Sequence, residues 1–234
     1  MWIRLFLIWM ILCMTSQQHL EPHVKKMLNA SLEDSELDNL YLLSRKYSDE
    51  LFDDQVAGKI TLEEMHIRRI KDACADTGIE ISAEQALEFQ NTYVQEQGKI
   101  ELFDEAVQLL DYLTAGKKQL AVLTNGAEDH QTMKIKQLKL SRWIPEDYLF
   151  ISGAIGHAKP SVEAFHFIED KLDLTKSKTV YVGDSFANDV VGAKQAGWQA
   201  VWMNHRNRQM PEAAAKPDKI VYSAKELLDF FLES

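Results

Sequence analysis

Two aspartates that follow an apolar run are the residues of this chain best suited to metal chemistry. The run "TVYV" leads into Gly183 and Asp184, and Asp189 closes the stretch "GDSFAND". Two carboxylates this close, with no basic residue between them, can supply oxygen ligands to a hard cation such as Mg²⁺. Asp189 also suits the first turn of a helix, where the helix dipole favours an acid. Asp184, at the end of a buried strand, needs a partner.

Four other polar or turn-forming residues stand at similar boundaries. Thr124 ends the apolar run "LAVLT" and is followed by Asn125 and Gly126, while Lys159 precedes Pro160, which suits the first turn of a helix. A Thr hydroxyl and the N–H groups of a turn can hold a phosphate oxygen, and a lysine can offset phosphoryl charge. The plainer alternatives are an ordinary Asn-Gly turn and a solvated surface lysine.

The elements that must position these residues alternate between strands and helices from residue 102 onward. We expect strands at 119–126, 148–156, 179–185, 199–204 and 219–223, and helices at 103–118, 161–174, 188–198 and 224–234. Such alternation predicts a parallel α/β sheet with helices on both faces. Sheets of this kind place their sites at the carboxyl ends of the strands, where the polar residues above fall.

A helical block precedes this α/β region. From about residue 20 to 97 apolar residues recur at spacings of three and four, which predicts about four helices. One begins near Ser31, with Glu33 and Asp34 in its first turn, and another runs from Thr61 to Gly78. The chain therefore combines a helical part with an α/β part.

Composition limits the partners and the compartment. The chain has 234 residues, with 36 acidic against 26 basic side chains and a net charge of -10, which disfavours a nucleic-acid partner. Cys13 and Cys74 are too few for a disulfide framework or a zinc knuckle, which favours a reducing, cytoplasmic setting. The oligomeric state cannot be inferred from these features.

The apolar start "FLIWMILCMT" (residues 6–15) has three interpretations: a membrane anchor, the core of a signal peptide, or a buried strand. It is shorter than the ~20 residues that cross a bilayer. No small-residue cleavage site follows it. A membrane partner is therefore disfavoured, and the signal peptide and the buried strand remain as alternatives.

Taken in order, the strand ends resemble three motifs of the haloacid dehalogenase superfamily of phosphohydrolases. "LTNG" is similar to its second motif, "KPSVEAF" to its third and "GDSFAND" to its fourth, within a core that runs from residue 102 to 234. The resemblance implies a Rossmann-like core with an inserted helical cap. Residues 1–18 would then supply the first core strand, 19–97 the cap and 98–234 the rest of the core.

The resemblance also assigns roles to the residues of these motifs. It implies that Thr124 and Lys159 are catalytic groups that bind the phosphoryl group, and Asn125 and Gly126 fall in the same phosphate-binding motif. It further implies that Asp184 and Asp189 bind Mg²⁺ and the ligand shell around the ion. Closure of the cap would exclude water and select the substrate.

The first motif of this superfamily, D-x-D-x-T, is absent from the chain as written. Its first Asp forms an aspartyl phosphate and its second is a general acid and base. The chain has no Asp before Asp34, and "FLIWMILCMT" stands where the motif belongs.

The genetic code shows that the motif can be hidden in a shifted reading frame. Trp is always TGG and Met always ATG, so a codon made from the last base of Trp9 and the first two of Met10 must be GAT, which is Asp. The junction after Met10 also gives Asp, and so does the junction after Met14. The shifted reading of residues 7–15 is compatible with "DLDDTLYD", in which the Leu7–Ile8 junction can supply the first Asp.

We therefore expect a frame-shifted catalytic strand in a nucleotidase-like phosphatase. An intact copy would be a Mg²⁺-dependent hydrolase of a nucleoside monophosphate or another small phosphorylated metabolite, and this chain would be inactive. One alternative is a non-catalytic phosphate-binding protein, either free or tethered to a membrane. A second alternative is a haloacid dehalogenase. The dehalogenase subfamily lacks the second Asp and the "GD" of the fourth motif, so "GDSFAND" favours phosphate chemistry.

Overall fold

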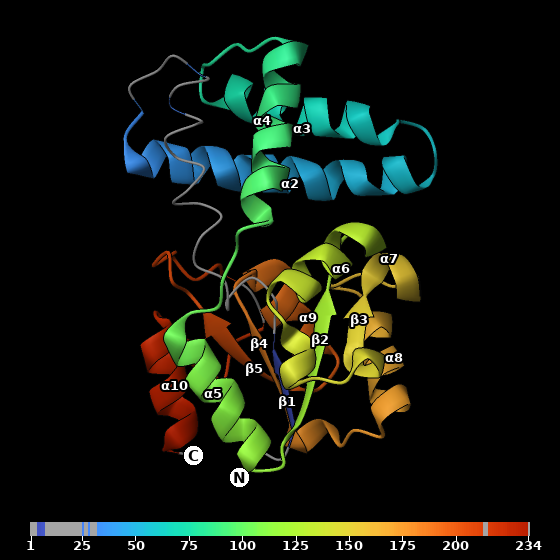
Figure 1. Cartoon of the computed structure of the whole chain (residues 1–234), viewed down its shortest axis with the longest axis vertical. Coiled ribbons are helices and arrows are strands. Elements are labelled where there is room, and N and C mark those ends of the chain that lie inside the picture. The colour runs from blue at the N-terminus through green and yellow to red at the C-terminus, as the bar shows by residue number, and fades with distance from the viewer. Residues whose placement is uncertain (1–3, 8–24, 26–27, 29–31, 213–214, 234) are drawn as a thin grey trace. The chain divides into compact units, whose positions relative to one another are not determined.

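The computed structural model describes residues 4–7, 25, 28, 32–212 and 215–233, and these divide into two compact units. One unit lies within residues 15–99 and is helical. The other combines residues 4–7 with those from 100 onward and contains the sheet (Figure 1). The core unit carries every site residue expected from the sequence.

Six parallel strands form one sheet in the order β3-β2-β1-β4-β5-β6. The strands are β1 (Arg4–Leu7), β2 (Gln119–Thr124), β3 (Leu149–Ile151), β4 (Thr179–Gly183), β5 (Gln199–Met203) and β6 (Lys219–Val221). The expected parallel α/β fold is confirmed. Each strand from β2 to β5 ends where a polar or turn-forming segment begins, because the buried apolar run stops there.

The first strand lies at the centre of the sheet. Residues Arg4–Leu7 pair with β2 on one side and β4 on the other, and Leu7 lies opposite Val122 and Val182. A strand was expected within residues 6–15, and β1 overlaps the start of this segment. Residues 8–15, which carry the rest of the hidden motif, lie outside the described residues.

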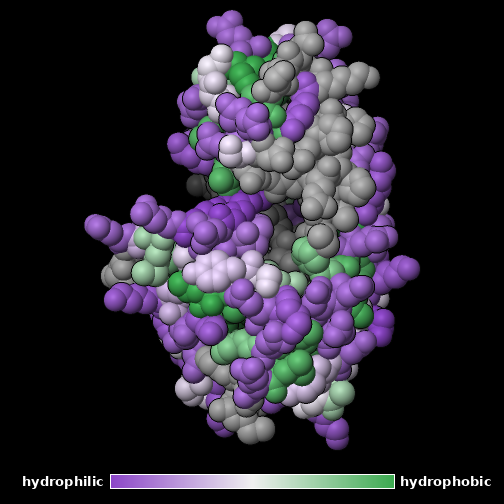
Figure 2. All heavy atoms as spheres, turned by 90° about the vertical axis from the view of Figure 1, so that its left-hand side faces the viewer, coloured by the Kyte–Doolittle hydropathy of each residue, from purple (hydrophilic) through white to green (hydrophobic). Residues whose placement is uncertain are grey.

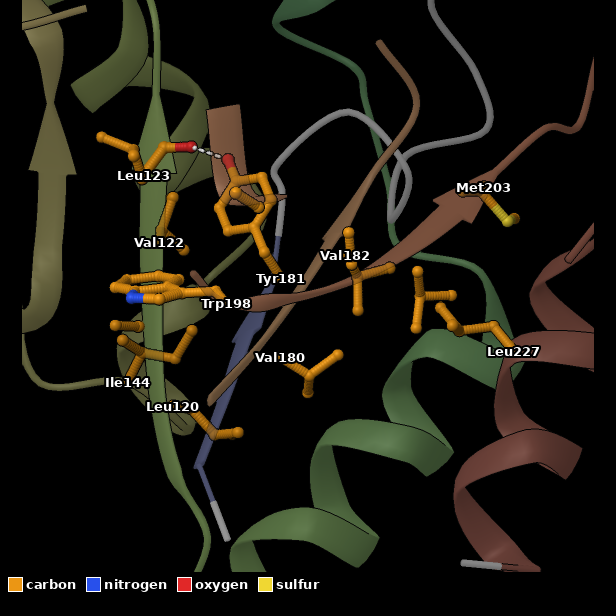
Figure 3. Close-up of a cluster of buried hydrophobic side chains, with 14 of the residues drawn as sticks. Leu120, Val122, Leu123, Ile144, Val180, Tyr181, Val182, Trp198, Met203 and Leu227 are labelled. Carbon is orange, nitrogen blue, oxygen red and sulfur yellow. Dashed lines mark hydrogen bonds between the residues drawn. The ribbon is translucent and has the colours of Figure 1, made fainter. Parts of the chain in front are cut away.

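Helices cover both faces of the sheet (Figure 1). Those that frame the core and the site are α5 (Asp104–Ala115), α6 (Glu128–Gln137), α8 (Val162–Leu172), α9 (Val191–Gln195) and α10 (Ala224–Leu232). Along β4 the side chains alternate: Val180 and Val182 lie toward Leu227 of α10, whereas Tyr181 lies on the opposite face with Trp198 (Figure 3). The period-two alternation of a strand therefore places one polar side chain, Tyr181, in the buried layer beneath α8.

Four local features differ from the expected elements. Helix α6 was not expected, β3 ends at Ile151 and gives way to the short helix α7 (Ser152–Ile155), and a π-helical turn over Phe186–Val190 precedes α9. Helix α8 begins at Val162, so Pro160 lies before it and not in its first turn. Each difference is at the carboxyl edge of the sheet, where side-chain hydrogen bonds compete with regular structure.

The helical unit contains α2 (Asp34–Val56), α3 (Leu62–Asp76) and α4 (Ala83–Gln97). Helix α3 begins at the expected place because Thr61 and Glu64 form a capping box: the Thr61 hydroxyl accepts from the Glu64 N–H, and the Glu64 carboxylate accepts from the Thr61 N–H. Ser82 and Gln85 cap α4 in the same way. These helices enclose a separate apolar cluster that includes Ile70 and Phe89.

The surface carries only scattered large apolar side chains among the described residues, among them Leu62, Val94 and Leu232. The face in Figure 2 is mainly hydrophilic, with small separate hydrophobic areas. None of the helices in the described part of the chain is both long and apolar enough to cross a bilayer.

Candidate active site

The loop after β2 is held in place by its own turn residues. Thr124 is 5% exposed, and its hydroxyl makes one long hydrogen bond, 3.5 Å to the Asn125 carbonyl oxygen. The Gly126 N–H donates to the Ser152 hydroxyl over 2.9 Å, and the Gln131 amide donates to the Asn125 carbonyl over 3.0 Å. Gly126 adopts a φ of 143°, and an added Cβ would lie 2.4 Å from Gln131 Nε2, so glycine is required there.

Asn125 joins this loop to the loop that carries Lys159. The Asn125 side-chain N–H donates to the Lys159 carbonyl over 2.8 Å, and the Lys159 N–H donates back to the Asn125 Oδ1 over 2.9 Å. Asn125 is therefore more than part of an ordinary Asn-Gly turn, because it connects two of the expected motifs. These hydrogen bonds fix the backbone of Lys159 beside the end of β2.

The Lys159 side chain is buried and does not extend into solvent. Its ammonium donates to Asp189 Oδ1 over 2.8 Å and to the Tyr181 hydroxyl over 2.9 Å, with 6% of the side chain exposed. The interpretation of Lys159 as a solvated surface lysine is wrong. A buried ammonium of this kind places positive charge where water screens it little.

Asp189 is the buried anion of this pair. Its Oδ1 accepts from Lys159 and its Oδ2 accepts from the Ser185 N–H over 2.9 Å. Burial raises the pKa of the Asp189 carboxyl, and the Lys159 ammonium opposes that rise. Gly183 is required beside it, because an added Cβ would lie 2.3 Å from the Asp189 Cβ.

Asp184 has a different environment from Asp189. It is half-buried, directly follows β4, and receives no hydrogen bond or ion pair on its carboxylate from any residue that the structure describes. Its backbone carbonyl accepts from the Trp202 indole N–H over 3.1 Å, which anchors the residue. Asp184 is thus held by its main chain while its carboxylate stays available.

This donor set fits Mg²⁺ in part. A protein commonly binds Mg²⁺ through one or two carboxylates and leaves the other positions to phosphate and water. Asp184 can supply one such carboxylate, whereas each Asp189 oxygen already accepts one hydrogen bond. No cluster of three His, Cys, Asp or Glu side chains suited to a metal occurs in the described ranges.

These groups surround the end of the central strand. Thr124 lies two residues beyond Val122 on β2, and Asp184 lies two beyond Val182 on β4; Leu7, the last residue of β1, pairs with both valines. The Leu7–Ile8 junction, where the shifted reading begins its Asp-rich motif, therefore follows directly from the end of β1. The structure thus brings the second, third and fourth motifs to one edge of the sheet.

Three side chains of this network were not expected from the sequence. Tyr181 lies within the apolar run of β4, and Ser152 lies in a segment expected to be strand. No sequence spacing identifies Tyr181 or Ser152 as a site residue, because the hydrogen-bond partner of each is distant in the sequence. Gln131 was missed together with its helix, α6.

The fold and the strand-end groups define a Rossmann-like α/β protein with a separate helical unit. The chain belongs to the haloacid dehalogenase-like hydrolases, whose family model matches residues 20–197, more than half of the chain. The resemblance seen in the motifs is confirmed, and the family match begins after the apolar segment.

Known proteins share parts of this sequence or all of the fold. The chain is 32% identical to pyrimidine 5'-nucleotidase YjjG of Escherichia coli, over 52% of this chain and 53% of that protein. It is 30% identical to a phosphoserine phosphatase of Thermus thermophilus, over 62% of this chain and 57% of that protein. The match therefore spans little more than half the length of these relatives.

A solved structure extends the comparison to the whole fold. The HAD-hydrolase YfnB of Bacillus subtilis, bound to magnesium, matches with a TM-score of 0.70, 19% identity and 98% coverage of both chains. At that identity the likeness concerns the fold alone. The magnesium is a property of that structure.

Proposed function

We propose that the intact form of this protein is a Mg²⁺-dependent phosphomonoester hydrolase that works through an aspartyl phosphate. The observation that carries the proposal is the meeting of Thr124, Lys159 and Asp184 around the end of β1. A hydroxyl donor, a buried cation and an available carboxylate are the groups that a phosphoryl site needs. Membership of the family supports the same reaction class.

The residues of this chain would bind and polarise the phosphoryl group. Lys159 would donate to one phosphoryl oxygen and Thr124 to another, which offsets the charge that develops during transfer. Asp184 would hold Mg²⁺, which when bound neutralises phosphoryl oxygens as a Lewis acid. Asp189 would keep Lys159 charged and in place through the ion pair described above.

The covalent step belongs to the missing motif. The first Asp of "DLDDTLYD" would form a bond to phosphorus as the phosphorus–oxygen bond to the leaving alcohol breaks, and the second Asp would protonate that alcohol. Water, deprotonated by the same second Asp, would then cleave the aspartyl phosphate and release inorganic phosphate. The chain as written has neither Asp, so these steps cannot proceed.

We infer that the segment after Leu7 is a shifted reading of this motif. Support comes from the place where β1 ends, since the first Asp of the shifted reading belongs to the Leu7–Ile8 junction. Loss of a catalytic nucleophile can lower turnover on the order of a million-fold, as in protease triads. The chain as written would retain phosphate-binding groups without turnover, which is the non-catalytic alternative.

The proposed substrate class is a small phosphomonoester, with a nucleoside monophosphate as the first candidate. The nucleotidase relative supports this choice, while the phosphoserine phosphatase relative keeps other small phosphorylated metabolites within the class. The available Asp184 carboxylate favours metal-assisted phosphate chemistry over dehalogenation. We propose that the helical unit acts as the cap that selects among these substrates.

The test compares three purified proteins: the chain as written, a restored chain in which residues 8–15 are replaced by DLDDTLYD, and a control with NLDDTLYD at the same positions. The restored chain should hydrolyse p-nitrophenyl phosphate and release phosphate from nucleoside monophosphates, and EDTA should abolish both activities. The other two should show no turnover. Equal activity of the written and restored chains would overturn the proposal, and so would a genomic sequence that cannot encode Asp across Leu7 and Ile8.

A further inference from the structure

Tyr181 makes a polar connection inside an otherwise apolar layer. It is 1% exposed on β4, and its hydroxyl accepts from the Lys159 ammonium over 2.9 Å. The same hydroxyl donates to the Leu123 carbonyl oxygen over 3.1 Å (Figure 3). The bridge therefore links β4 to the carboxyl end of strand β2 and to the loop that carries Lys159.

Aromatic neighbours fix the direction of this hydroxyl. The Phe165 ring of α8 packs edge-on against Tyr181 with centroids 5.2 Å apart, and the Trp198 ring lies at 6.5 Å. Burial raises the pKa of Tyr181 well above its ordinary value, with Asp189 and Asp184 adding to the rise, so the phenol keeps its proton. A neutral phenol can donate to Leu123 and accept from Lys159 at the same time.

The donors of Lys159 can be counted. An ammonium group has three N–H donors and no acceptor. Asp189 takes one and Tyr181 takes a second, and the described residues offer no third acceptor to this ammonium. With respect to these residues, one N–H is therefore left for a ligand, in a direction set by the two that are engaged.

Burying a hydroxyl costs free energy unless both its donor and acceptor functions are used. A phenylalanine would fill the same space in this aromatic cluster without that requirement. The Tyr181 hydroxyl uses both functions, because it accepts from the buried Lys159 ammonium and donates to the Leu123 carbonyl. Packing alone does not account for the hydroxyl.

We propose that Tyr181 is a positioning residue that holds the Lys159 ammonium so that its remaining N–H reaches a single phosphoryl oxygen. The role as stated rests on the proposed function, since the oxygen belongs to the proposed substrate. The restraint on Lys159 itself does not depend on turnover. It can be measured in the chain as written.

The first experiment observes Lys159 directly by NMR. Lysine labelled with ¹³C at Cε would be incorporated into the chain as written, and the Lys159 signal assigned by its loss in Lys159→Arg. Tyr181→Phe should move that signal toward the position of the mobile surface lysines, while Tyr112→Phe, at an exposed tyrosine on α5, should leave it unchanged. An unmoved Lys159 signal in folded Tyr181→Phe would overturn the proposal.

A reciprocal measurement covers the case in which Tyr181→Phe does not fold. The chain would be labelled with 3-fluorotyrosine, and Lys159→Met would remove the ammonium while the tyrosine stays. The ¹⁹F signal of one buried tyrosine should shift, because its hydroxyl loses a charged donor. If no buried tyrosine signal responds, the proposed restraint does not exist.

The third measurement uses the restored chain and tests the consequence for phosphate. Tyr181→Phe should weaken inhibition by orthovanadate about tenfold, the size expected for one charged hydrogen bond, with little change in the Mg²⁺ concentration that gives half-maximal activity. Loss of folded protein would lower kcat and leave the inhibition constant unchanged. If the restored parent is inactive the proposed function fails, and the NMR result still decides the role of Tyr181.

Discussion

The Lys159–Asp189 pair has two properties that usually conflict: it is almost fully buried, and it lies beside a site that must receive an anion. Removing water strengthens the attraction between the charges but costs solvation of both ions. Hydrogen bonds from Ser185 to the carboxylate and from Lys159 to Tyr181 compensate part of that cost. Removing one partner should therefore be much more harmful than neutralising both.

At this scale we predict that Lys159→Met lowers the free energy of unfolding by about 3 kcal/mol, because it leaves Asp189 buried without its cation. Lys159→Met combined with Asp189→Asn should recover much of that loss, since Asn can still accept from the Ser185 N–H. Urea unfolding of the full chain measures both. Lys46→Met is the matched control: its pair with Glu50 is exposed, and its loss should cost less than about 1 kcal/mol.

A double variant no more stable than Lys159→Met alone would show that the charge of Asp189 is not what destabilises the single variant.

Individual residues of the site were only partly predictable from the sequence. The sequence predicted Thr124, Lys159 and Asp184 because polar groups at strand ends are conspicuous. Tyr181 was missed because a tyrosine inside an apolar run is indistinguishable from a packing residue until its hydroxyl has a partner.

At the scale of elements, regular periodicity and capping made α3, α8 and the strands predictable. Helix α6 was missed because its sequence "EDHQTMKIKQ" buries Gln131 and Lys134 as well as Ile135, so no apolar stripe marks its inner face. The end of β3 was missed for a related reason. Apolar residues recur at Ala154 and Ile155, but the Ser152 hydroxyl accepts from the Gly126 N–H, and the chain turns into a short helix there.

The capping box of α3 gives a prediction for an element. Thr61→Ala should destabilise the helical unit by about 1 kcal/mol, because the Glu64 N–H loses its acceptor. Thr61→Ser should be close to neutral, since Ser offers the same hydroxyl. Hydrogen exchange of the α3 amides in the full chain is the measurement. Equal protection in the Ala and Ser variants would contradict this account of the helix start.

At the scale of the whole molecule, the division into two units implies that they need not respond alike to pH. His66 lies on α3, and its ring nitrogen is 3.4 Å from the Gln90 side-chain nitrogen. Burial, together with a smaller effect of the nearby Arg69 guanidinium, lowers the pKa of His66 to about 4. The unfolded chain would bind a proton near the ordinary value of 6.5, while the folded chain would not.

Because of this difference, the stability that His66 contributes is complete above about pH 6.5 and declines as the pH falls toward 4. We predict that the urea midpoint of the helical unit drops between pH 7 and pH 5, and that His66→Gln drops less over the same range. Circular dichroism during urea titration of the full chain measures both. An identical pH dependence in the two proteins would exclude His66 as the cause.

The central position of β1 affects which measurements can distinguish a frame-shifted chain from an intact one. Its pairing with β2 and β4 is made by backbone groups, which are the same in any reading frame. A frame shift confined to this segment can therefore remove an enzyme's activity and leave a folded product. Both products would keep the backbone pairing of β1, and an assay for released phosphate would separate them.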